Sequence, residues 1–236
     1  GLIGHYVVDE NTTATSWNDT TGINPVEITG SLDLVTKDNY VNGPIIESGI
    51  QTFPYLKGGT GSTIKWPSTF DIDVNTDYTM IHVTRYDPSA TAKQRIIDLE
   101  INNWLMGHWG GYAGLTTHGT AWIGGVNHGS VSNDGNFNNG DVWVFGITRP
   151  YKYTSSYYPF NVSSLTDPYL NNNGWAEKTT TDYILTGNGS MTINAGNATN
   201  QKSDFNVAEF IGYNRALTDA EVGQMKNYLV DKYSPE

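Results

Sequence analysis

The sequence contains no cysteine, few basic residues and no long apolar run. Without cysteine, disulfides contribute nothing, so the 236 residues must fold on a hydrophobic core alone, for which the chain is long enough. Only 13 Lys and Arg stand against 24 Asp and Glu, and they are scattered along the chain, which argues against nucleic acid as a partner. No apolar stretch approaches the length of a membrane span, so we expect no membrane insertion.

Charged residues are also scarce, at 16% of the chain, while Asn, Thr, Gly and Ser are abundant. Such surfaces are common among extracellular β-proteins and virion proteins, so we expect an extracellular or virion-surface location. The chain has five Asn-x-Ser/Thr sequons, at Asn11, Asn18, Asn161, Asn188 and Asn197. They accept glycans only in a secretory pathway, and chance alone supplies several in a sequence of this composition.

Short β-like runs alternate with turn signals along most of the chain. Runs rich in β-branched and aromatic residues predict strands at 2–8, 45–49, 62–66, 78–86, 94–102, 141–149 and 205–215, together with "NWLMGHW" and "AWIGG". The stretch 183–196 predicts a hairpin that turns at Gly187-Asn188-Gly189. With no βαβ alternation, this pattern predicts an antiparallel sandwich.

One segment, at the C-terminal end, predicts a helix over about 217–232. Thr218 and Glu221 have the spacing of a capping box. A single apolar stripe follows, made of Val222, Met225, Leu229 and Tyr233. That stripe must pack on the outer side or edge of a sheet. We expect residues 1–236 to form one all-β domain with one C-terminal helix, which can be part of a longer chain.

Three motifs resemble those of laminin-G-like domains of the concanavalin A-like lectin/glucanase superfamily. The segment "EFIGYNRALTDAE" (209–221) resembles the last strand and helix start of such domains, and its matching residues are Glu209, Tyr213, Asn214, Arg215, Leu217, Thr218 and Glu221. "SWNDTTG" (16–22) is similar to a Trp-x-Asp-x-Ser-Gly segment, and "NNWLMGHWGG" (102–111) to a segment in the middle of these domains. The resemblance implies a jelly-roll sandwich of two antiparallel sheets, and it is specific to no single activity.

Asp98 and Glu100, in "RIIDLE" (95–100), are the candidate catalytic residues. On a strand they share a face, and retaining glycosidases need two carboxyl groups about 5–5.5 Å apart. The stretch resembles the Glu-x-Asp-x-x-Glu strand of laminarinase-type hydrolases of the superfamily, but Ile96 stands where the nucleophilic Glu would be. The alternative interpretation, which we favour, is a pair of solvated or salt-bridged face residues, with Arg95 or Lys93 as partners.

Two stretches could hold a metal. His108, His118 and His128 are spaced ten residues apart, and three histidines can form a zinc site. The spacings are, however, wider than those of catalytic zinc sites. "SNDGNFNNGD" (132–141) offers oxygen ligands for calcium, namely Asp134, Asn136, Asn138 and Asp141, and faintly resembles the calcium loop of legume-type lectins. The alternatives are loop histidines and a plain Asx-rich turn. We expect no other cofactor.

"NNWLMGHWGGYAG" (102–114) is the candidate ligand-binding stretch, because aromatic rings stack on the apolar faces of sugars and polar side chains reach their hydroxyl groups. Strand alternation places Trp104, Met106 and His108 on one face and Leu105 and Trp109 on the other. The candidate glycan-binding residues are His108, Trp109, Tyr112, Trp122 and Asn127.

The prediction is a non-enzymatic module that binds a glycan or cell-surface polysaccharide, on a virion or a cell surface. Three alternatives remain open at this point. The aromatic residues can simply fill the core, the module can be purely structural and associate with itself or a neighbouring structural protein, or the protein can be a divergent glycosidase or lyase that uses Asp98 and Glu100.

Overall fold

The structure is a computed structural model that describes residues 1–20, 24–36, 53–70, 72–73, 77–100, 103–118, 121–123, 143–151, 154–161, 178–180 and 188–233. Within them, the paired strands run antiparallel and form two large sheets with one C-terminal helix. The predicted all-β sandwich with a C-terminal helix is confirmed.

The first sheet has eight strands. Seven of them follow one another in the spatial order β14 (Lys178–Thr180), β13 (Thr154–Asn161), β12 (Val144–Tyr151), β7 (Thr79–Tyr86), β17 (Phe205–Tyr213), β4 (Tyr55–Gly58) and β3 (Leu32–Val35). The eighth, β1 (Leu2–Val7), pairs with the second half of β17. Strands from both ends of the chain therefore meet at the centre of this sheet.

The second sheet has seven strands. Their spatial order is β11 (Ala121–Ile123), β10 (Tyr112–His118), β9 (Trp104–Trp109), β8 (Ile97–Leu99), β16 (Met191–Ile193), β5 (Thr63–Lys65) and β2 (Glu27–Thr29). A short 3-10 helix, η2 (Ser68–Phe70), and a two-stranded sheet of β6 (Ile72–Asp73) and β15 (Asn188–Gly189) complete the described elements. The turn predicted at Gly187-Asn188-Gly189 is therefore wrong at Asn188 and Gly189, which pair with β6 instead.

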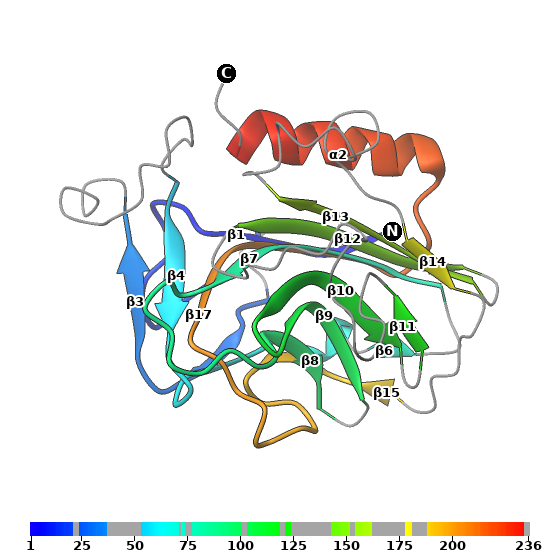
Figure 1. Cartoon of the computed structure of the whole chain (residues 1–236). Coiled ribbons are helices and arrows are strands. Elements are labelled where there is room, and N and C mark those ends of the chain that lie inside the picture. The colour runs from blue at the N-terminus through cyan, green and yellow to red at the C-terminus, as the bar shows by residue number, and fades with distance from the viewer. Residues whose placement is uncertain are drawn as a thin grey trace.

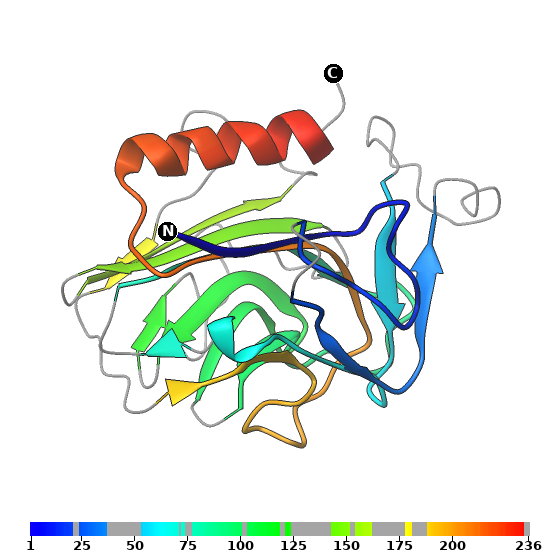
Figure 2. The ribbon, with the colours of Figure 1, turned by 180° about the vertical axis from the view of Figure 1, so that it is seen from behind.

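The elements stack in three layers. The helix α2 (Asp219–Tyr233) crosses the eight-stranded sheet on its outer side, and the seven-stranded sheet lies against the other side (Figure 1). Seen from behind, β1 runs beneath the helix, and the loop that leads from β16 to β17 lies at the opposite end of the stack (Figure 2). The two sheets thus have one outer face each, and these faces are covered differently.

Two hydrophobic clusters follow from this layering. The larger lies between the sheets and includes Tyr6, Trp17, Trp66, Phe70, Trp104, Met106 and Phe210. The second joins the eight-stranded sheet to the helix and includes Ile81, Val83, Phe145, Ile211, Val222, Leu229 and Tyr233. Because each face of β7 meets one cluster, all eight of its residues are buried. Full burial of one such aliphatic side chain contributes about 1.5–3 kcal/mol.

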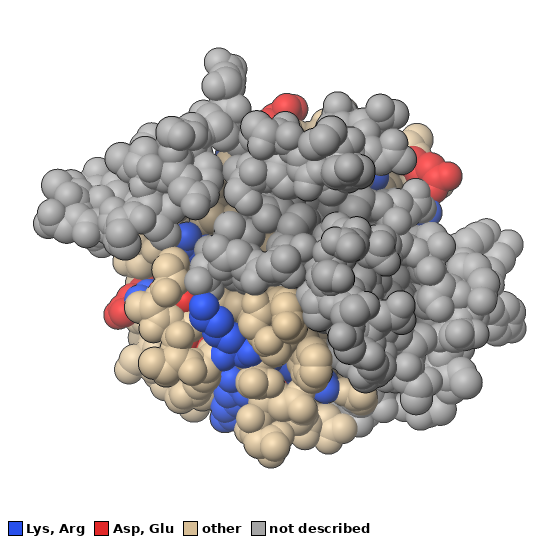
Figure 3. All heavy atoms as spheres, viewed as in Figure 1, with Lys and Arg blue, Asp and Glu red and all other residues tan. Residues whose placement is uncertain are grey.

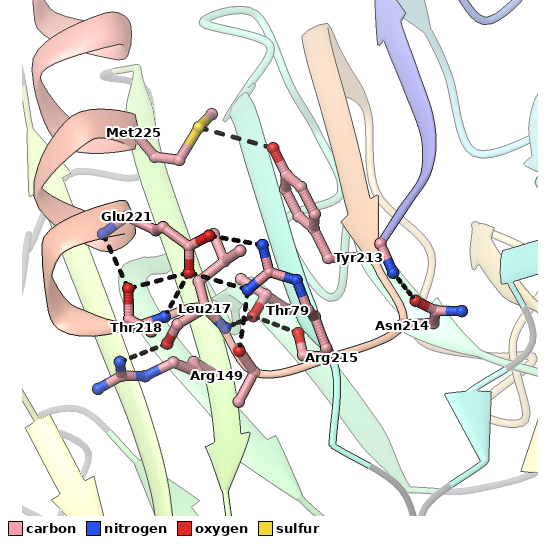
Figure 4. Close-up of polar contacts among 11 residues, drawn as sticks. Thr79, Arg149, Tyr213, Asn214, Arg215, Leu217, Thr218, Glu221 and Met225 are labelled. Atoms are coloured by element: carbon pink, nitrogen blue, oxygen red, sulfur yellow. Dashed lines mark hydrogen bonds and ion pairs between the residues drawn. The ribbon is translucent and has the colours of Figure 1, made fainter.

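The start of α2 is fixed by the predicted capping box. The Glu221 amide donates to Thr218 Oγ1 at 3.3 Å, and the Thr218 amide donates to Glu221 Oε2 at 2.8 Å. Arg215 clamps the same carboxylate with both terminal nitrogens, at 2.8 and 2.6 Å (Figure 4). Of the predicted stripe, Val222, Leu229 and Tyr233 are buried and Met225 is partly buried against the sheet. The helix prediction is confirmed.

A buried carboxylate fastens the rest of α2 to the sheet. Glu209, on β17, is 0% exposed and accepts hydrogen bonds from Tyr228, Tyr233 and Lys232 of the helix and contacts His5 of β1. Burial raises the pKa of Glu209, but the hydrogen bond from His5 and the charge of Lys232 outweigh it and leave that pKa below its ordinary value. The side-chain contacts of Glu209 are therefore structural, because they hold the helix against the eight-stranded sheet.

Candidate aromatic ligand-binding site

Two aromatic residues of the candidate site, Trp109 and Tyr112, lie on the outer face of the seven-stranded sheet. Trp109 ends β9, Tyr112 begins β10, and the two residues are direct cross-strand partners. Gly110 and Gly111 connect them with φ of 61° and 90°, the left-handed conformation that a two-residue type I′ turn needs. A two-glycine turn therefore makes Trp109 and Tyr112 cross-strand neighbours at the hairpin end of β9 and β10.

Leu105 supports both rings from below. It is 0% exposed, and the half-buried Trp109 and Tyr112 pack against it in a cluster separate from the two main cores. Trp104 and Met106 point into the sandwich core instead. The predicted alternation is confirmed: one tryptophan of the stretch is core, and the other lies on the outer face.

A side chain from a distant loop fixes the edge of the indole ring. Trp109 Nε1 donates to Gln201 Oε1 at 3.3 Å, and Arg95 Nε donates to the same oxygen at 2.6 Å. Arg95 also donates, through Nη2, to Asn103 Oδ1. Arg95 is 5% exposed, whereas Gln201 is only partly buried, so Arg95 positions Gln201 and Gln201 lies beside the aromatic pair at the surface.

The loop that carries Gln201, residues 194–204, is held firmly by Asn194. This residue has φ of 59°, and its Nδ2 donates to the backbone oxygens of Gly59, Ser62 and Ser203 at 3.2, 3.1 and 2.8 Å. The Ser203 amide donates back to Asn194 Oδ1 at 2.8 Å. Asn194 therefore fixes the position of the loop, since it joins the two ends of the loop to each other and to the turn between β4 and β5.

Asp98 lies under this loop. It is 2% exposed and accepts a hydrogen bond from Thr192 Oγ1 at 2.5 Å, and a Cβ added at Gly196 would lie 2.1 Å from its carboxyl group. Burial raises the pKa of Asp98 to about 7, against the opposing effects of the Thr192 hydrogen bond and the Arg95 charge. A carboxyl group covered in this way has no room for a substrate.

Glu100, the second candidate catalytic residue, is paired with a cation. Its Oε1 lies 2.7 Å from Lys65 Nζ, and both side chains are more than one-third exposed. Lys65 comes from β5, two strands away from β8 in the sheet. The two carboxylates thus have separate environments, one buried and one in a surface ion pair, which matches the salt-bridged interpretation better than a catalytic pair.

His108 lies in the interior of the sandwich, away from Trp109. It is 0% exposed, and its Nδ1 lies 3.3 Å from Thr84 Oγ1, which also contacts His82 Nδ1 at 2.7 Å. Burial lowers the pKa of His82 to about 3 and holds that of His108 well below its ordinary value. His108 therefore does not line the outer face, although it was a candidate glycan-binding residue.

The side chains of the other candidate residues lie outside the part of the chain that the structure describes. In the backbone register, Trp122 of β11 lies opposite Thr117 of β10. His118 of β10 lies opposite Trp104 of β9. Asn127, His128 and the predicted calcium ligands Asp134, Asn136, Asn138 and Asp141 lie outside the described residues. Among the described residues there is no group of three or more His, Asp or Glu side chains that could hold a metal ion.

A polar pocket of about 270 Å³ lies elsewhere, between the end of β1 and the following loop. Its lining includes the carboxylates of Asp9 and Asp19. Asp9 accepts from the Asn11 amide at 2.9 Å and from Thr12 Oγ1 at 3.2 Å, and Asp19 accepts from Asn24 at 3.3 Å. These hydrogen bonds shape the loop itself, so we interpret the pocket as part of the N-terminal turn.

Comparison with known proteins finds likeness in structure but not in sequence. No family model and no curated protein matches the chain. The binding domain of Paraclostridial Mosquitocidal Protein 1 superposes with a TM-score of 0.54 at 10% identity, over 98% of this chain and 52% of that chain. The binding domain of Botulinum Neurotoxin DC in complex with SialylT gives 0.51 at 13% identity, over 97% and 51%.

A third similar structure is domain 4 of AbnA, an extracellular GH43 arabinanase from Geobacillus stearothermophilus, in complex with arabinotriose. Its TM-score is 0.55 at 16% identity, and the match covers 95% of this chain and 97% of that domain. Trypanosoma rangeli sialidase in complex with sialic acid matches over 98% of this chain but 33% of its own length. The chain thus spans a third to a half of the toxin and sialidase chains, and identities this low show the fold alone.

No helix in the described part of the chain is both long and apolar enough to cross a membrane. The sequence did not indicate Gln201 or Asn103 as site residues, and it indicated Arg95 only as a partner of Asp98 or Glu100. Gln201 lies 92 positions beyond Trp109, and no local pattern links the two residues.

Proposed function

We propose that this protein is a non-enzymatic carbohydrate-binding module of the concanavalin A-like, laminin-G-like kind, and that it attaches an extracellular or virion-surface protein to glycans. The observation that carries the proposal is the paired, half-buried Trp109 and Tyr112 on a support of Leu105. Partly exposed aromatic rings are a feature on which the apolar faces of sugar rings stack. The likeness in fold to a toxin binding domain in complex with SialylT, and to an arabinanase domain in complex with arabinotriose, supports the same function.

The arrangement of carboxylates supports the non-enzymatic part of the proposal. A retaining glycosidase needs two carboxyl groups that both reach the substrate. Asp98 is covered by the loop at Gly196, and Glu100 is occupied by Lys65. The described residues therefore favour binding over hydrolysis.

A glycan array run with the whole chain tests this function, once with calcium and once with a chelator. We expect selective binding that is lost in Trp109→Ala and Tyr112→Ala but kept in Leu2→Ala, a control at the exposed first residue of β1. Loss of binding with the chelator would support a calcium site at 132–141. Silence on the array, combined with self-association in solution, would replace the proposal with a purely structural module.

A further inference from the structure

The side-chain amide of Gln201, beside the aromatic pair, indicates which class of sugar the pair binds. Gln201 Oε1 accepts from both Trp109 Nε1 and Arg95 Nε. An indole N–H and a guanidinium N–H can only donate hydrogen bonds. If the side-chain amide of Gln201 were flipped, its NH2 group would face both of these donors, so the flipped orientation is excluded. Its orientation is thereby fixed, and Nε2 faces away from both partners.

Gln201 Nε2 therefore offers donors only. It has no acceptor among the residues that the structure describes, and the side chain is partly exposed. A ligand that lies on Trp109 meets these N–H groups at the edge of the ring. The complementary ligand group is an acceptor, and a carboxylate fits best, because a hydrogen bond to a charged acceptor is about twice as strong as one to a neutral hydroxyl oxygen.

Positive charge gathers at the same place. Residues 92–95 and 201–204 run side by side, joined by hydrogen bonds from the Arg95 amide to Gln201 O at 3.2 Å and from the Asp204 amide to Ala92 O at 2.9 Å. This pair of segments carries Lys93, Arg95 and Lys202. Lys and Arg atoms gather over the part of the described surface that Figure 1 shows around β8 and this loop (Figure 3).

The acidic groups nearby are largely satisfied within the protein. Asp204 accepts from the amides of Thr60, Thr91 and Ala92 at 3.2, 2.9 and 3.2 Å, and Asp98 is buried. In a chain of net charge −11, this corner therefore presents donors and cations beside two aromatic rings. Such a corner attracts anions while the rest of the surface repels them.

We infer that the aromatic pair binds a glycan residue that carries a carboxylate, with Gln201 Nε2 and Lys202 as the groups that recognise the anion. The inference rests on the proposed function and narrows it to acidic sugars. Trp109 and Tyr112 supply the stacking surface, and Arg95 acts as a positioning residue through Gln201 Oε1. A neutral sugar keeps the stacking but loses the charge-assisted hydrogen bonds.

The test uses matched pairs of glycans: uronic-acid and sialic-acid oligosaccharides, and the same oligosaccharides with the carboxyl group reduced to an alcohol. We expect the wild-type chain to prefer the acidic member by about tenfold or more, as expected for one charge-assisted hydrogen bond. Raising the salt concentration from about 50 to about 500 mM should weaken only the acidic member.

Gln201→Glu is the sharpest variant, because it keeps an oxygen for Trp109 and Arg95 and replaces the donors with negative charge. It should lower the affinity for the acidic member by about tenfold or more and leave the neutral member within about threefold. Lys202→Gln should act in the same direction more weakly, whereas Lys226→Gln removes the same charge from α2 and should change neither.

Equal affinity of the wild-type chain for both members of each pair would overturn the inference and leave the proposed function standing. An effect of Lys226→Gln as large as that of Lys202→Gln would also overturn it, because net charge alone would then be the cause. Failure to bind any member would overturn the proposed function itself, and with it this inference.

Discussion

The two outer faces of the sandwich differ in what covers them. We expect one face to contribute mainly to stability and the other to ligand binding. The face of the eight-stranded sheet lies under α2, where Leu229 and Tyr233 are buried and Glu209 is hydrogen-bonded to helix side chains. On the outer face of the seven-stranded sheet, the loop 194–204 lies over Asp98, and the aromatic pair Trp109 and Tyr112 stays partly exposed. A sealed face contributes stability, and an open aromatic face is available to a ligand.

Each face also has a buried carboxylate, and the two behave oppositely. Glu209 gains enough donors and positive charge to hold its pKa below the ordinary value, whereas burial raises the pKa of Asp98 to about 7. Ionised Glu209 is therefore stabilised by its surroundings, and ionised Asp98 is not. Substitutions on the two faces should separate these roles.

The largest effect is expected under the helix. Leu229→Ala removes a fully buried side chain and should lower the free energy of unfolding by about 2–5 kcal/mol. The reason is the lost burial together with the cavity left behind. Denaturant titration measures the loss. Glycan binding by the folded fraction should not change, and a change would mean that the two faces are coupled.

Glu209→Gln should have the next largest effect and lower the free energy of unfolding by about 1–3 kcal/mol. The reason is that the donors of Lys232, Tyr228 and Tyr233 are then poorly paired. Since the pKa of Glu209 is lowered by folding, its stabilising contribution is present above the unfolded pKa of about 4.5 and is lost as the pH falls below it. The gap between wild type and variant should therefore narrow in acid.

Urea titrations of both proteins at a series of pH values measure that gap. A gap that stays constant down to acidic pH would show that the charge of Glu209 does not matter for the helix.

Asp98→Asn should change stability with the opposite pH dependence. Folding raises the pKa of Asp98 from 3.8 to about 7, so the wild-type contribution is fully present below about 3.8 and is lost as the pH rises to about 7. Asn has no such dependence. Above pH 7 the variant should be more stable than the wild type, by about 1–2 kcal/mol. Thermal unfolding of both proteins across this range checks the sign, and a less stable variant at high pH contradicts it.

An effect on folding similar in size to that of Asp98→Asn is expected at the turn between the aromatic residues. Gly110→Ala places a Cβ at a φ of 61° and should cost about 1–2 kcal/mol, which weakens the pairing of Trp109 with Tyr112. Gly110→Asn is the matched control, because Asn tolerates this conformation. Thermal unfolding and glycan titration measure both variants. If Ala and Asn behave alike, the turn does not position the rings.

The sequence predicts best what is determined locally. The capping box at Thr218 and the stripe ending at Tyr233 lie within one helix, and strand alternation alone separates Trp104 from Trp109. The same alternation puts His108 in the interior with Trp104, and only its capacity for hydrogen bonding made it a candidate glycan ligand. Thr84 and His82 supply its surroundings from another sheet.

What the sequence does not show depends on contacts between distant segments. Gln201 meets Trp109 because Asn194 ties the loop to Gly59 and Ser62, residues more than a hundred positions away. Lys65 reaches Glu100 across the sheet. The Asn188-Gly189 pair looks like a turn in the sequence but forms strand β15, because β6 pairs with it. Periodicity and turn propensity carry no information about such partners.

The central claim is that the loop-covered face binds sugar while the helix-covered face provides stability. The most direct test measures glycan affinity and unfolding free energy together for Trp109→Ala. The account predicts that affinity falls by about tenfold or more while the free energy of unfolding falls by less than the loss of about 2–5 kcal/mol expected for Leu229→Ala, since the Trp109 side chain is partly exposed. Unchanged affinity, or a loss of stability like that of Leu229→Ala, would contradict it.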